Sequence, residues 1–493
     1  MQSNLLKKAR EYESTHSQNI TPEQRPAFHL SSLVGWMNDP NGFSYYDGKY
    51  HLFYQYHPYD LRWGPMHWGH AVSTDFIRWE FEPCALAPDE QYDSFGCFSG
   101  SALETADGKH LIMYTGVEEV QAEDGTKQIF QTQCVAVGDG VNYEKYQANP
   151  VIDKRHIPEE FSTVDFRDPK IWQEADGSYR VVVANRHADG SGALLVFRSQ
   201  DAYQWEFETV LDQSCNEIGK MWECPDYFKL DGKDVILISP QDMTQQGLEF
   251  HNGNGTVYIV GTYNDSTKKI QRETVQAIDY GLDFYAPQTL LTPDGRRVMV
   301  AWMQNWDACV PPPAPLPWYG QMTIPRELSV KNGKLIQNPV RELEQYRGHG
   351  VNHSTTLSEE TMLQGVCGRV VDMTVEIEPT VDGSYQKFTM KLASGTRYFT
   401  SLTYNAADSI LHFDRNHSGL CRDIVSERRF HVRNQQGKLK LRILMDRFSV
   451  EIFVNDGEQA FTSTIYTPIS SDGITFACDG ELNLSVEKFD LNL

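Results

Sequence analysis

Most of the chain alternates short apolar runs with turn residues, a pattern typical of β-strands. Of the eight Asp-Gly pairs between residues 43 and 302, five recur at near-regular spacing and each precedes an apolar run, whereas those at 124, 139 and 189 fall outside this phase. Asp-Gly before an apolar run is a strong β-hairpin signal. The five pairs begin at positions 47, 107, 176, 231 and 294, which gives spacings of 60, 69, 55 and 63 residues. The strands predicted after them cover residues 50–55, 110–115, 179–184, 235–239 and 298–302.

A second phrase repeats in phase with these hairpins. Residues 73–80 (STDFIRWE), 137–144 (VGDGVNYE) and 199–206 (SQDAYQWE) recur after 64 and 62 residues. A single Asp-Gly pair is a common turn and indicates little by itself. Five near-regular pairs with a second motif in phase indicate a repeat of short strands, which is typical of a β-propeller. The sequence therefore predicts a five-bladed β-propeller.

The C-terminal part has a different pattern. Alternating strands such as 438–444, 449–454 and 482–489 are joined by turns, as expected for an antiparallel β-sandwich. The predicted fold class is therefore all-β, with a propeller followed by a sandwich. The expected divisions are an N-terminal extension at 1–21 with a peripheral helix, a catalytic propeller at 22–340, a linker at 341–354 and a sandwich at 355–493.

Charge and cysteine usage exclude several classes of partner. The 44 Lys+Arg against 67 Asp+Glu give a net charge of −23, which disfavours nucleic acid and anionic membranes. The nine cysteines are scattered without a CxxC pair, so we expect neither a disulfide framework nor a zinc site. The chain shows no signal-peptide pattern and no apolar run of membrane-spanning length. We expect a cytoplasmic protein that needs no metal or cofactor.

Candidate catalytic residues emerge from the hairpin alignment. The positions eight residues before the five Asp-Gly pairs hold Asp39, Ser99, Asp168, Glu223 and Ala286. Three of these five equivalent positions are carboxylates, in three different blades. Because equivalent strand positions share depth and direction, we expect these side chains to converge on the propeller axis if their strands are innermost.

Clustered carboxylates suit glycoside hydrolysis, in which one carboxylate is the nucleophile and another carboxyl donates a proton. Arg167 is expected to hold its neighbour Asp168 ionised. Glu223, flanked by the apolar Trp222 and Cys224, is expected to be the proton donor. Taken singly, each position has a simpler interpretation: a turn at Asp39, an internal ion pair at Asp168 and a solvated strand end at Glu223. The shared offset favours the functional interpretation.

Aromatic and amide side chains near the carboxylates fit a sugar pocket, which combines apolar faces with a few polar groups. A single Trp more often packs in a hydrophobic core. We expect this for Trp79 and Trp205, the two tryptophans of the repeated phrase. The candidate substrate-binding residues are Trp36, Asn38, Gln55, Trp63, Phe98, Ser99, Arg167 and Trp302.

Five motifs together carry a family resemblance: residues 36–42 (WMNDPNG), 98–101 (FSGS), 166–169 (FRDP), 223–226 (ECPD) and 283–286 (DFYA). In this order they resemble the signatures of glycoside hydrolase family 32, the β-fructofuranosidases, and are most similar to its bacterial invertase and sucrose-6-phosphate hydrolase branch. The resemblance runs from about residue 25 to 345. The C-terminal region resembles the family's sandwich by position and pattern.

The resemblance implies a retaining mechanism on a terminal β-linked fructosyl unit. Asp39 matches the nucleophile, Glu223 the acid/base and Asp168 the transition-state stabiliser. The positions that match fructose-binding residues are Asn38, Gln55, Trp63, Ser99 and Arg167. The family uses neither metal nor cofactor.

Several alternatives stay open at this stage. Relatives on the same fold are inverting glycosidases or fructosyltransferases, and a non-catalytic sugar-binding propeller is a different class. The substrate is a small fructosyl-containing sugar: sucrose, sucrose 6-phosphate or a short fructo-oligosaccharide. The net negative charge favours unphosphorylated sucrose, unless a local Arg or Lys offsets it. The strand edges of the sandwich offer surfaces for a homo-oligomer.

Overall fold

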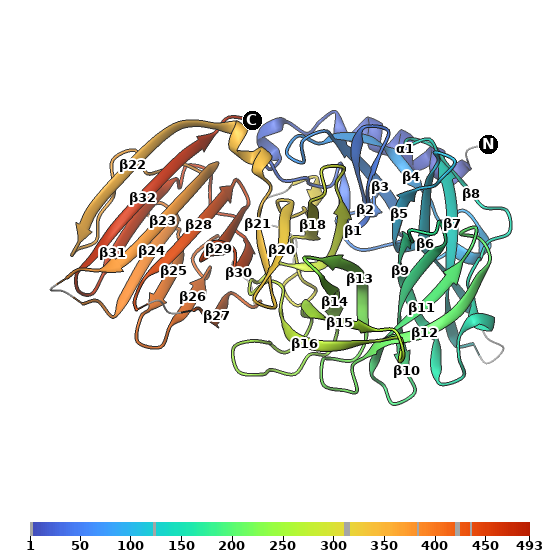
Figure 1. Ribbon diagram of the computed structural model, residues 1–493. Coiled ribbons are helices and arrows are strands. Elements are labelled where there is room, and N and C mark those ends of the chain that lie inside the picture. Colours follow the sequence, from blue (N-terminus) through green and yellow to red (C-terminus); the bar gives the residue numbers. More distant parts are fainter. Residues whose placement is uncertain (1–2, 122–124, 310–315, 382–383, 420–423, 434–435) are drawn as a thin grey trace.

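The computed structural model describes residues 3–121, 125–309, 316–381, 384–419, 424–433 and 436–493. Two β-rich units lie side by side, the N-terminal one drawn in blue to yellow and the C-terminal one in orange to red (Figure 1). The all-β expectation is confirmed. Among the helices in these ranges, none is long and apolar enough to cross a membrane.

The N-terminal unit consists of five sheets, each built around four antiparallel strands, and the first sheet has one additional short parallel strand. In blade one these are β1 (Gly35–Tyr46), β2 (Lys49–His57), β3 (His67–Ser73) and β4 (Glu80–Leu86). In blade two they are β5 (Gly96–Glu104), β6 (His110–Gln121), β7 (Lys127–Gly138) and β8 (Tyr143–Lys145). In blade three they are β9 (Phe161–Gln173), β10 (Tyr179–His187), β11 (Gly192–Ser199) and β12 (Trp205–Gln213). All three hairpins predicted here from Asp-Gly turns are present.

Blades four and five complete the ring. Blade four contains β13 (Trp222–Leu230), β14 (Lys233–Pro240), β15 (Val257–Asn264) and β16 (Lys269–Ala277). Blade five contains β17 (Tyr285–Leu291), β18 (Arg297–Trp302), β20 (Arg326–Lys331) and β21 (Lys334–Pro339). The first strands contact one another in the cyclic order β1, β5, β9, β13 and β17, so they are the innermost strands, as predicted. The short strand β19 (Trp318–Tyr319) pairs in parallel with the start of β1 and closes the ring.

Hydrogen bonds across the axis hold the innermost strands together. The Gln288 side chain accepts from the Phe43 amide at 2.7 Å and donates to the Gly100 carbonyl at 3.0 Å. The buried Lys170 ammonium lies 2.9 Å from Asp226, whose same oxygen accepts from the Thr289 amide at 2.6 Å. Together these bonds link strands from all five blades and give the buried polar groups partners within the protein.

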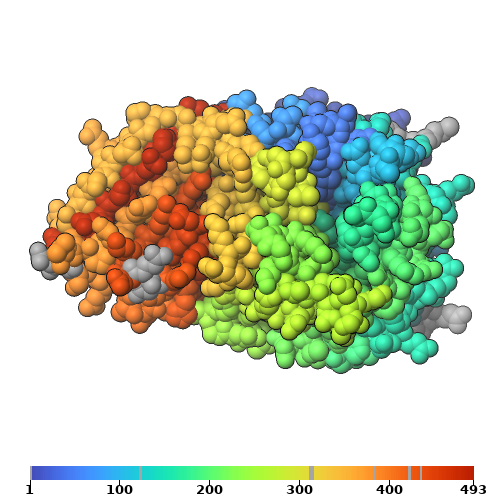
Figure 2. Space-filling view, viewed as in Figure 1, coloured from blue at the N-terminus to red at the C-terminus, as the bar shows by residue number. Residues whose placement is uncertain are grey.

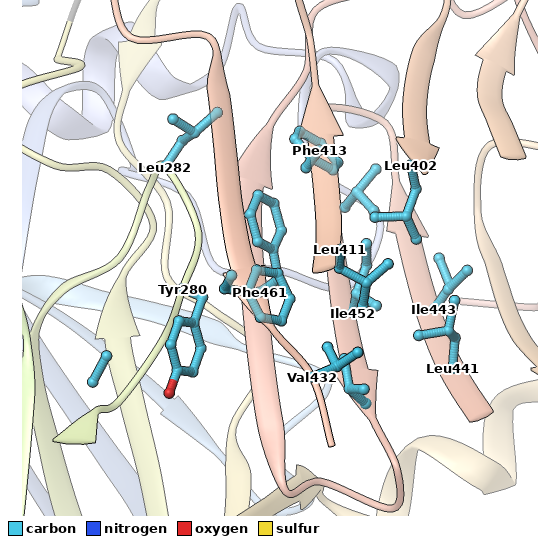
Figure 3. Packing of buried hydrophobic residues seen from close by; sticks show 14 of the residues in the cluster. Tyr280, Leu282, Leu402, Leu411, Phe413, Val432, Leu441, Ile443, Ile452 and Phe461 are labelled. Carbon is cyan, nitrogen blue, oxygen red and sulfur yellow. The ribbon is translucent and has the colours of Figure 1, made fainter. Parts of the chain in front are cut away.

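The C-terminal unit is a sandwich of two antiparallel sheets. One sheet has the order β22 (Arg347–Leu357), β32 (Leu482–Leu491), β23 (Val371–Pro379), β28 (Leu439–Asp446), β29 (Ser449–Val454) and β30 (Gln459–Thr464). The other has the order β27 (Glu427–His431), β26 (Ile410–Asp414), β25 (Thr400–Asn405), β24 (Lys387–Ser394) and β31 (Gly473–Cys478). Apolar side chains from both sheets fill the space between them, among them Leu411, Phe413, Ile443 and Ile452 (Figure 3).

The expected linker at 341–354 is shorter in the structure. A 3₁₀ turn, η4 (Arg341–Tyr346), leads directly into β22, which pairs with β32 and belongs to the sandwich. The pattern missed this strand because it is an edge strand in which Leu357 alone is fully buried. An edge strand that packs no apolar side chains shows no alternation.

The N-terminal extension contains the expected helix, α1 (Asn4–Ser17), which packs beside β4 on the outside of blade one. Ser3 caps it by accepting from the Leu6 amide at 3.1 Å.

Three further short 3₁₀ turns are η1 (Pro22–Gln24), η2 (Gln91–Asp93) and η3 (Lys154–His156).

The two units share a buried interface. The Tyr280 and Leu282 amides, on the chain between β16 and β17, donate to the carbonyls of Ala460 and Thr462 at 2.9 Å each. In Figure 3 the Tyr280 and Leu282 side chains lie next to the strand that carries Phe461. In the space-filling view the orange surface of the C-terminal unit adjoins yellow and green surfaces of the N-terminal unit (Figure 2).

Candidate active site

The residues eight positions before the five Asp-Gly pairs, called the offset-matched residues below, occupy one end of the propeller axis. Asp39, Asp168 and Glu223 lie on β1, β9 and β13, and Ser99 lies on β5. The Ser99 hydroxyl donates to Asp39 Oδ2 at 2.7 Å. The Cys224 amide donates to Asp168 Oδ2 at 2.9 Å, and its thiol contacts Asp39 Oδ2 at 3.4 Å. The predicted convergence of the three carboxylates is therefore present in the structure.

Every innermost strand has a register shift at or directly beside its offset-matched residue. The shifts lie between residues 37 and 40, 98 and 100, 167 and 170, 223 and 226, and 285 and 288. Asp168, Cys224 and Ala286 adopt positive φ angles of 65°, 48° and 52°, which side-chain-bearing residues rarely adopt. Such bulges turn side chains out of the regular strand alternation. Here they direct polar groups from five strands toward one point.

Asp39 is largely buried and accepts hydrogen bonds on both carboxylate oxygens. Besides Ser99, it accepts a hydrogen bond from the Asn38 amide group at 3.1 Å. Burial raises the pKa of Asp39, the hydrogen bond from Ser99 opposes this, and the charge of Glu223 adds to it. The group is thus positioned by donors on both oxygens, as a nucleophile requires.

Glu223 is held by a different set of donors. Arg167 Nε and Nη2 donate to Glu223 Oε1 at 3.1 and 2.9 Å, and the Tyr285 hydroxyl donates to Oε2 at 2.7 Å. Arg167 also pairs with Asp165 at 3.1 Å. The guanidinium that the sequence assigned to Asp168 therefore binds Glu223 in the structure.

Asp168 is consequently less ionised than expected. Burial, together with the charges of Glu223 and Asp39, raises its pKa to about 7 against a smaller opposing effect of Arg167. The prediction that Arg167 holds Asp168 ionised is wrong because desolvation outweighs the attraction of a guanidinium whose nitrogens point at Glu223.

The predicted binding residues separate into three groups. Asn38, Ser99 and Arg167 bond directly to the carboxylates. Phe98 packs against the aromatic cluster around Trp36, and Trp63, which is 40% exposed, meets the Phe98 ring edge to face at 5.9 Å. An exposed aromatic side chain supplies an apolar face for a sugar ring.

The third group, Trp36, Gln55 and Trp302, is held by contacts with neighbouring residues. The Trp36 indole donates to Asn38 Oδ1 at 2.7 Å and stacks on Tyr319 at 4.8 Å. The Gln55 amide group donates to the Cys97 carbonyl at 3.0 Å. Trp302 is fully buried 6.0 Å from Trp36, so it supports Trp36 from behind.

The sequence reasoning gave no role to Tyr285 or to Cys224, which was considered only as an apolar neighbour of Glu223. Cys224 touches both Asp39 and Asp168, and burial together with these two charges raises the pKa of its thiol. Both residues lie inside quoted motifs, so the signal was adjacency to an offset-matched position. Their contacts depend on the bulges, which no pattern of apolar residues reveals.

The fold and the site together define a class. Three carboxylates with separate donors and aromatic side chains nearby suit glycosidic bond cleavage by a nucleophile and a proton donor. Residues 29–339 match the family model described as "Glycosyl hydrolases family 32 N-terminal domain", and residues 342–492 match "Glycosyl hydrolases family 32 C terminal". The chain belongs to glycoside hydrolase family 32 and is a glycoside hydrolase.

Named relatives extend over nearly the whole chain. It is 37% identical to the raffinose invertase of Escherichia coli over 462 residues, covering 93% of each protein. It is 36% identical to the sucrose-6-phosphate hydrolase of Escherichia coli over 447 residues, covering 90% of this chain and 89% of the relative. A Bombyx mori β-fructofuranosidase variant solved with sucrose superposes with a TM-score of 0.85 at 33% identity, over 100% of this chain and 99% of that one.

Proposed function

We propose that the protein is a retaining β-fructofuranosidase that releases the terminal non-reducing fructosyl unit of sucrose-type substrates. The observation that carries this proposal is the unequal environment of the two principal carboxylates. Asp39 accepts from Ser99 and Asn38, whereas Glu223 accepts from Arg167 and Tyr285. Two roles in one pocket require two such environments.

In the proposed first step, Asp39 attacks the anomeric carbon of fructose while Glu223 passes a proton to the leaving oxygen. The pKa of Asp168 is raised to about 7, chiefly by burial, so the carboxylate cluster retains a proton close to neutral pH. Asp168 stabilises the positive charge that develops on the ring. In the second step Glu223 takes a proton from water, which hydrolyses the fructosyl-enzyme ester.

Substitution of the two carboxylates tests these roles. We expect Asp39→Ala and Glu223→Gln each to lower kcat for sucrose by several orders of magnitude. Azide should restore turnover of Glu223→Gln with an activated fructoside and give a β-fructosyl azide, because attack on the ester needs no base when azide is the nucleophile. Full sucrose turnover by Asp39→Ala would contradict the proposal.

The stereochemistry separates retention from the inverting alternative on the same fold. With sucrose and methanol, the first-formed methyl fructoside is expected to be the β-anomer by NMR. An α-anomer would exclude the covalent role of Asp39. The ratio of methyl fructoside to free fructose also measures the capacity for fructosyl transfer.

Substrate preference is part of the proposal. Relatives carry the names raffinose invertase, sucrose-6-phosphate hydrolase and levanase, all consistent with a fructosyl end group. We expect plain sucrose to be slightly preferred over sucrose 6-phosphate. Side-by-side kcat/KM values for sucrose, sucrose 6-phosphate and 1-kestose decide this point. A cytoplasmic setting and self-association through the sandwich also remain proposals, the latter open to light scattering.

A further inference from the structure

A second cavity lies at the end of the propeller axis opposite the carboxylates. Its volume is about 900 Å³, and each of the five innermost strands contributes to it. The contributing residues are 43–45 of β1, 102–104 of β5, 170–173 of β9, 227–229 of β13 and 289–291 of β17. They follow the offset-matched residues by two to six positions, or up to about 20 Å along an extended strand. The bonds of Gln288 and Lys170 cross the axis between the two ends.

The inner wall of this cavity carries an excess of positive charge. Lys170 and Arg297 both line it, and the nearest buried carboxylate is Asp226, which bonds to Lys170. Arg297 lies over the Phe228 ring at 4.7 Å and donates one long bond, 3.4 Å, to the Thr289 hydroxyl. Its Nε is buried without a partner, and within the described ranges it forms no ion pair. Arg297 is therefore a largely buried cation whose Nε donor is unused and whose one hydrogen bond is long.

The other basic groups in the lining do not share this property. Arg180 is bound by Glu174 and by Glu208 at 2.7 Å, and Lys268 lies 3.5 Å from Glu208. Lys229 and the carboxylates Glu104 and Asp265 complete the charged lining. These paired groups neutralise one another, and Lys170 is neutralised by Asp226 in the same way. Among the described residues of the lining, the unmatched buried cation is therefore Arg297.

Aromatic side chains line the same cavity beside these cations. Trp172 and Tyr227 meet edge to face at 5.4 Å, and both are only partly buried. The cavity is far larger than a free phosphate ion needs and lies within the range of small-molecule sites. A guanidinium with an unused donor suits an oxyanion with several acceptors, and aromatic faces suit a sugar ring.

We propose that this cavity binds a hexose phosphate, with its phosphate on Arg297 and its sugar ring against Trp172 and Tyr227. The site is separate from the catalytic pocket and independent of the proposed hydrolytic activity. It also places a local positive surface inside a molecule whose net charge is −23.

Calorimetric titration of the full-length protein with glucose 6-phosphate, inorganic phosphate and glucose tests the proposal. We expect glucose 6-phosphate to bind at least 10-fold more tightly than either of the other two. Arg297→Gln should weaken it at least 10-fold, whereas Arg180→Gln, which alters a neutralised rim cation, should weaken it less than 2-fold. Saturating fructose should not displace it, because fructose occupies the catalytic pocket.

Three results would overturn the proposal: equal affinity for inorganic phosphate and glucose 6-phosphate, undiminished binding by Arg297→Gln, or displacement by fructose. The fructose competition uses the native protein, so it tests whether the two sites are separate even if Arg297→Gln fails to fold. Arg297→Lys, which keeps the charge but loses the fork of donors, should bind with intermediate affinity. Sucrose hydrolysis by Arg297→Lys should stay unchanged, which separates this site from the catalytic one.

Discussion

The hydrogen bond between Ser99 and Asp39 influences the pH range in which the site is active. The Ser99 hydroxyl bonds to Asp39 Oδ2 at 2.7 Å and lowers a pKa that burial raises. In Ser99→Ala the pKa of Asp39 should rise further, because the charged form loses a donor. We expect the acidic limb of the kcat/KM profile to move to higher pH and kcat at neutral pH to fall about 10-fold.

The control for this prediction is Thr105→Ala, just beyond the end of β5 in an exposed turn. It should leave the profile unchanged. An unshifted acidic limb in Ser99→Ala would mean that another group sets that limb.

Tyr285 offers a second test at this scale. Its hydroxyl donates to Glu223 Oε2 at 2.7 Å. Tyr285→Phe should lower kcat for sucrose by about 10- to 100-fold with a smaller change in KM, because the acid/base loses the group that orients it. Tyr258→Phe, which removes a hydroxyl bonded to Gln276 at 2.6 Å, is the matched control and should keep full activity.

Residue identities were more predictable than residue partners. Asp39, Asp168 and Glu223 follow from a repeat offset, which the sequence contains directly. The partner of Arg167 does not follow from the sequence, because Glu223 lies 56 residues away from Arg167. The choice between Asp168 and Glu223 depends on the direction of the side chains at two bulges. A linear pattern carries no information about that direction.

At the scale of elements, the five innermost strands concentrate buried carboxylates at one end of the axis. The folded pKa of Asp168 is about 7, above its ordinary value, so its charged form is disfavoured in the folded state. Between about pH 4 and 7 the folded protein binds more protons than the unfolded chain, and stability falls as pH rises through this window.

Asp168→Asn should therefore stabilise the protein at pH 8, by roughly 2–4 kcal/mol, and little at pH 4. Urea denaturation at the two pH values measures the difference. Asp176→Asn, in the exposed turn between β9 and β10, is not expected to gain stability at either pH. A gain by Asp168→Asn that is independent of pH would point to packing instead of charge.

Elements with a buried face were predictable, and those without one were not. The five hairpins were found because apolar runs flank Asp-Gly turns. Strand β22 was missed because its residues lie mostly exposed at a sheet edge. The bulges were missed as well, because a register shift changes pairing without changing composition.

At the scale of the molecule, a buried ionic network joins propeller and sandwich. His29 lies 2.8 Å from Asp446 and 2.9 Å from Glu451, and Arg326 pairs with Asp279 at 2.9 Å and also bonds to Glu451. Burial alone would lower the pKa of His29, but its bonds to Asp446 and Glu451 raise it to about 9. The histidine thus stabilises the fold fully below about pH 6.5, and this contribution is lost as pH rises through 9.

His29→Gln should cost about 3 kcal/mol of unfolding free energy at pH 6, and its deficit relative to native protein should narrow by pH 10. Denaturant titrations at both pH values measure this. His412→Gln, whose ring pairs with Glu427 at 2.9 Å on the sandwich surface, should change stability little. A deficit that does not vary with pH would show that the ring acts through shape alone.

The closure of the ring by β19 determines how the enzyme loses activity when it is damaged. Two residues, Trp318 and Tyr319, pair with the start of β1 and join the last blade to the first. The carboxylates come from blades one, three and four, so the pocket exists only while the circle is complete. Damage to any blade should abolish turnover outright instead of weakening it in proportion, and residual activity in a heated or proteolysed sample then counts intact molecules.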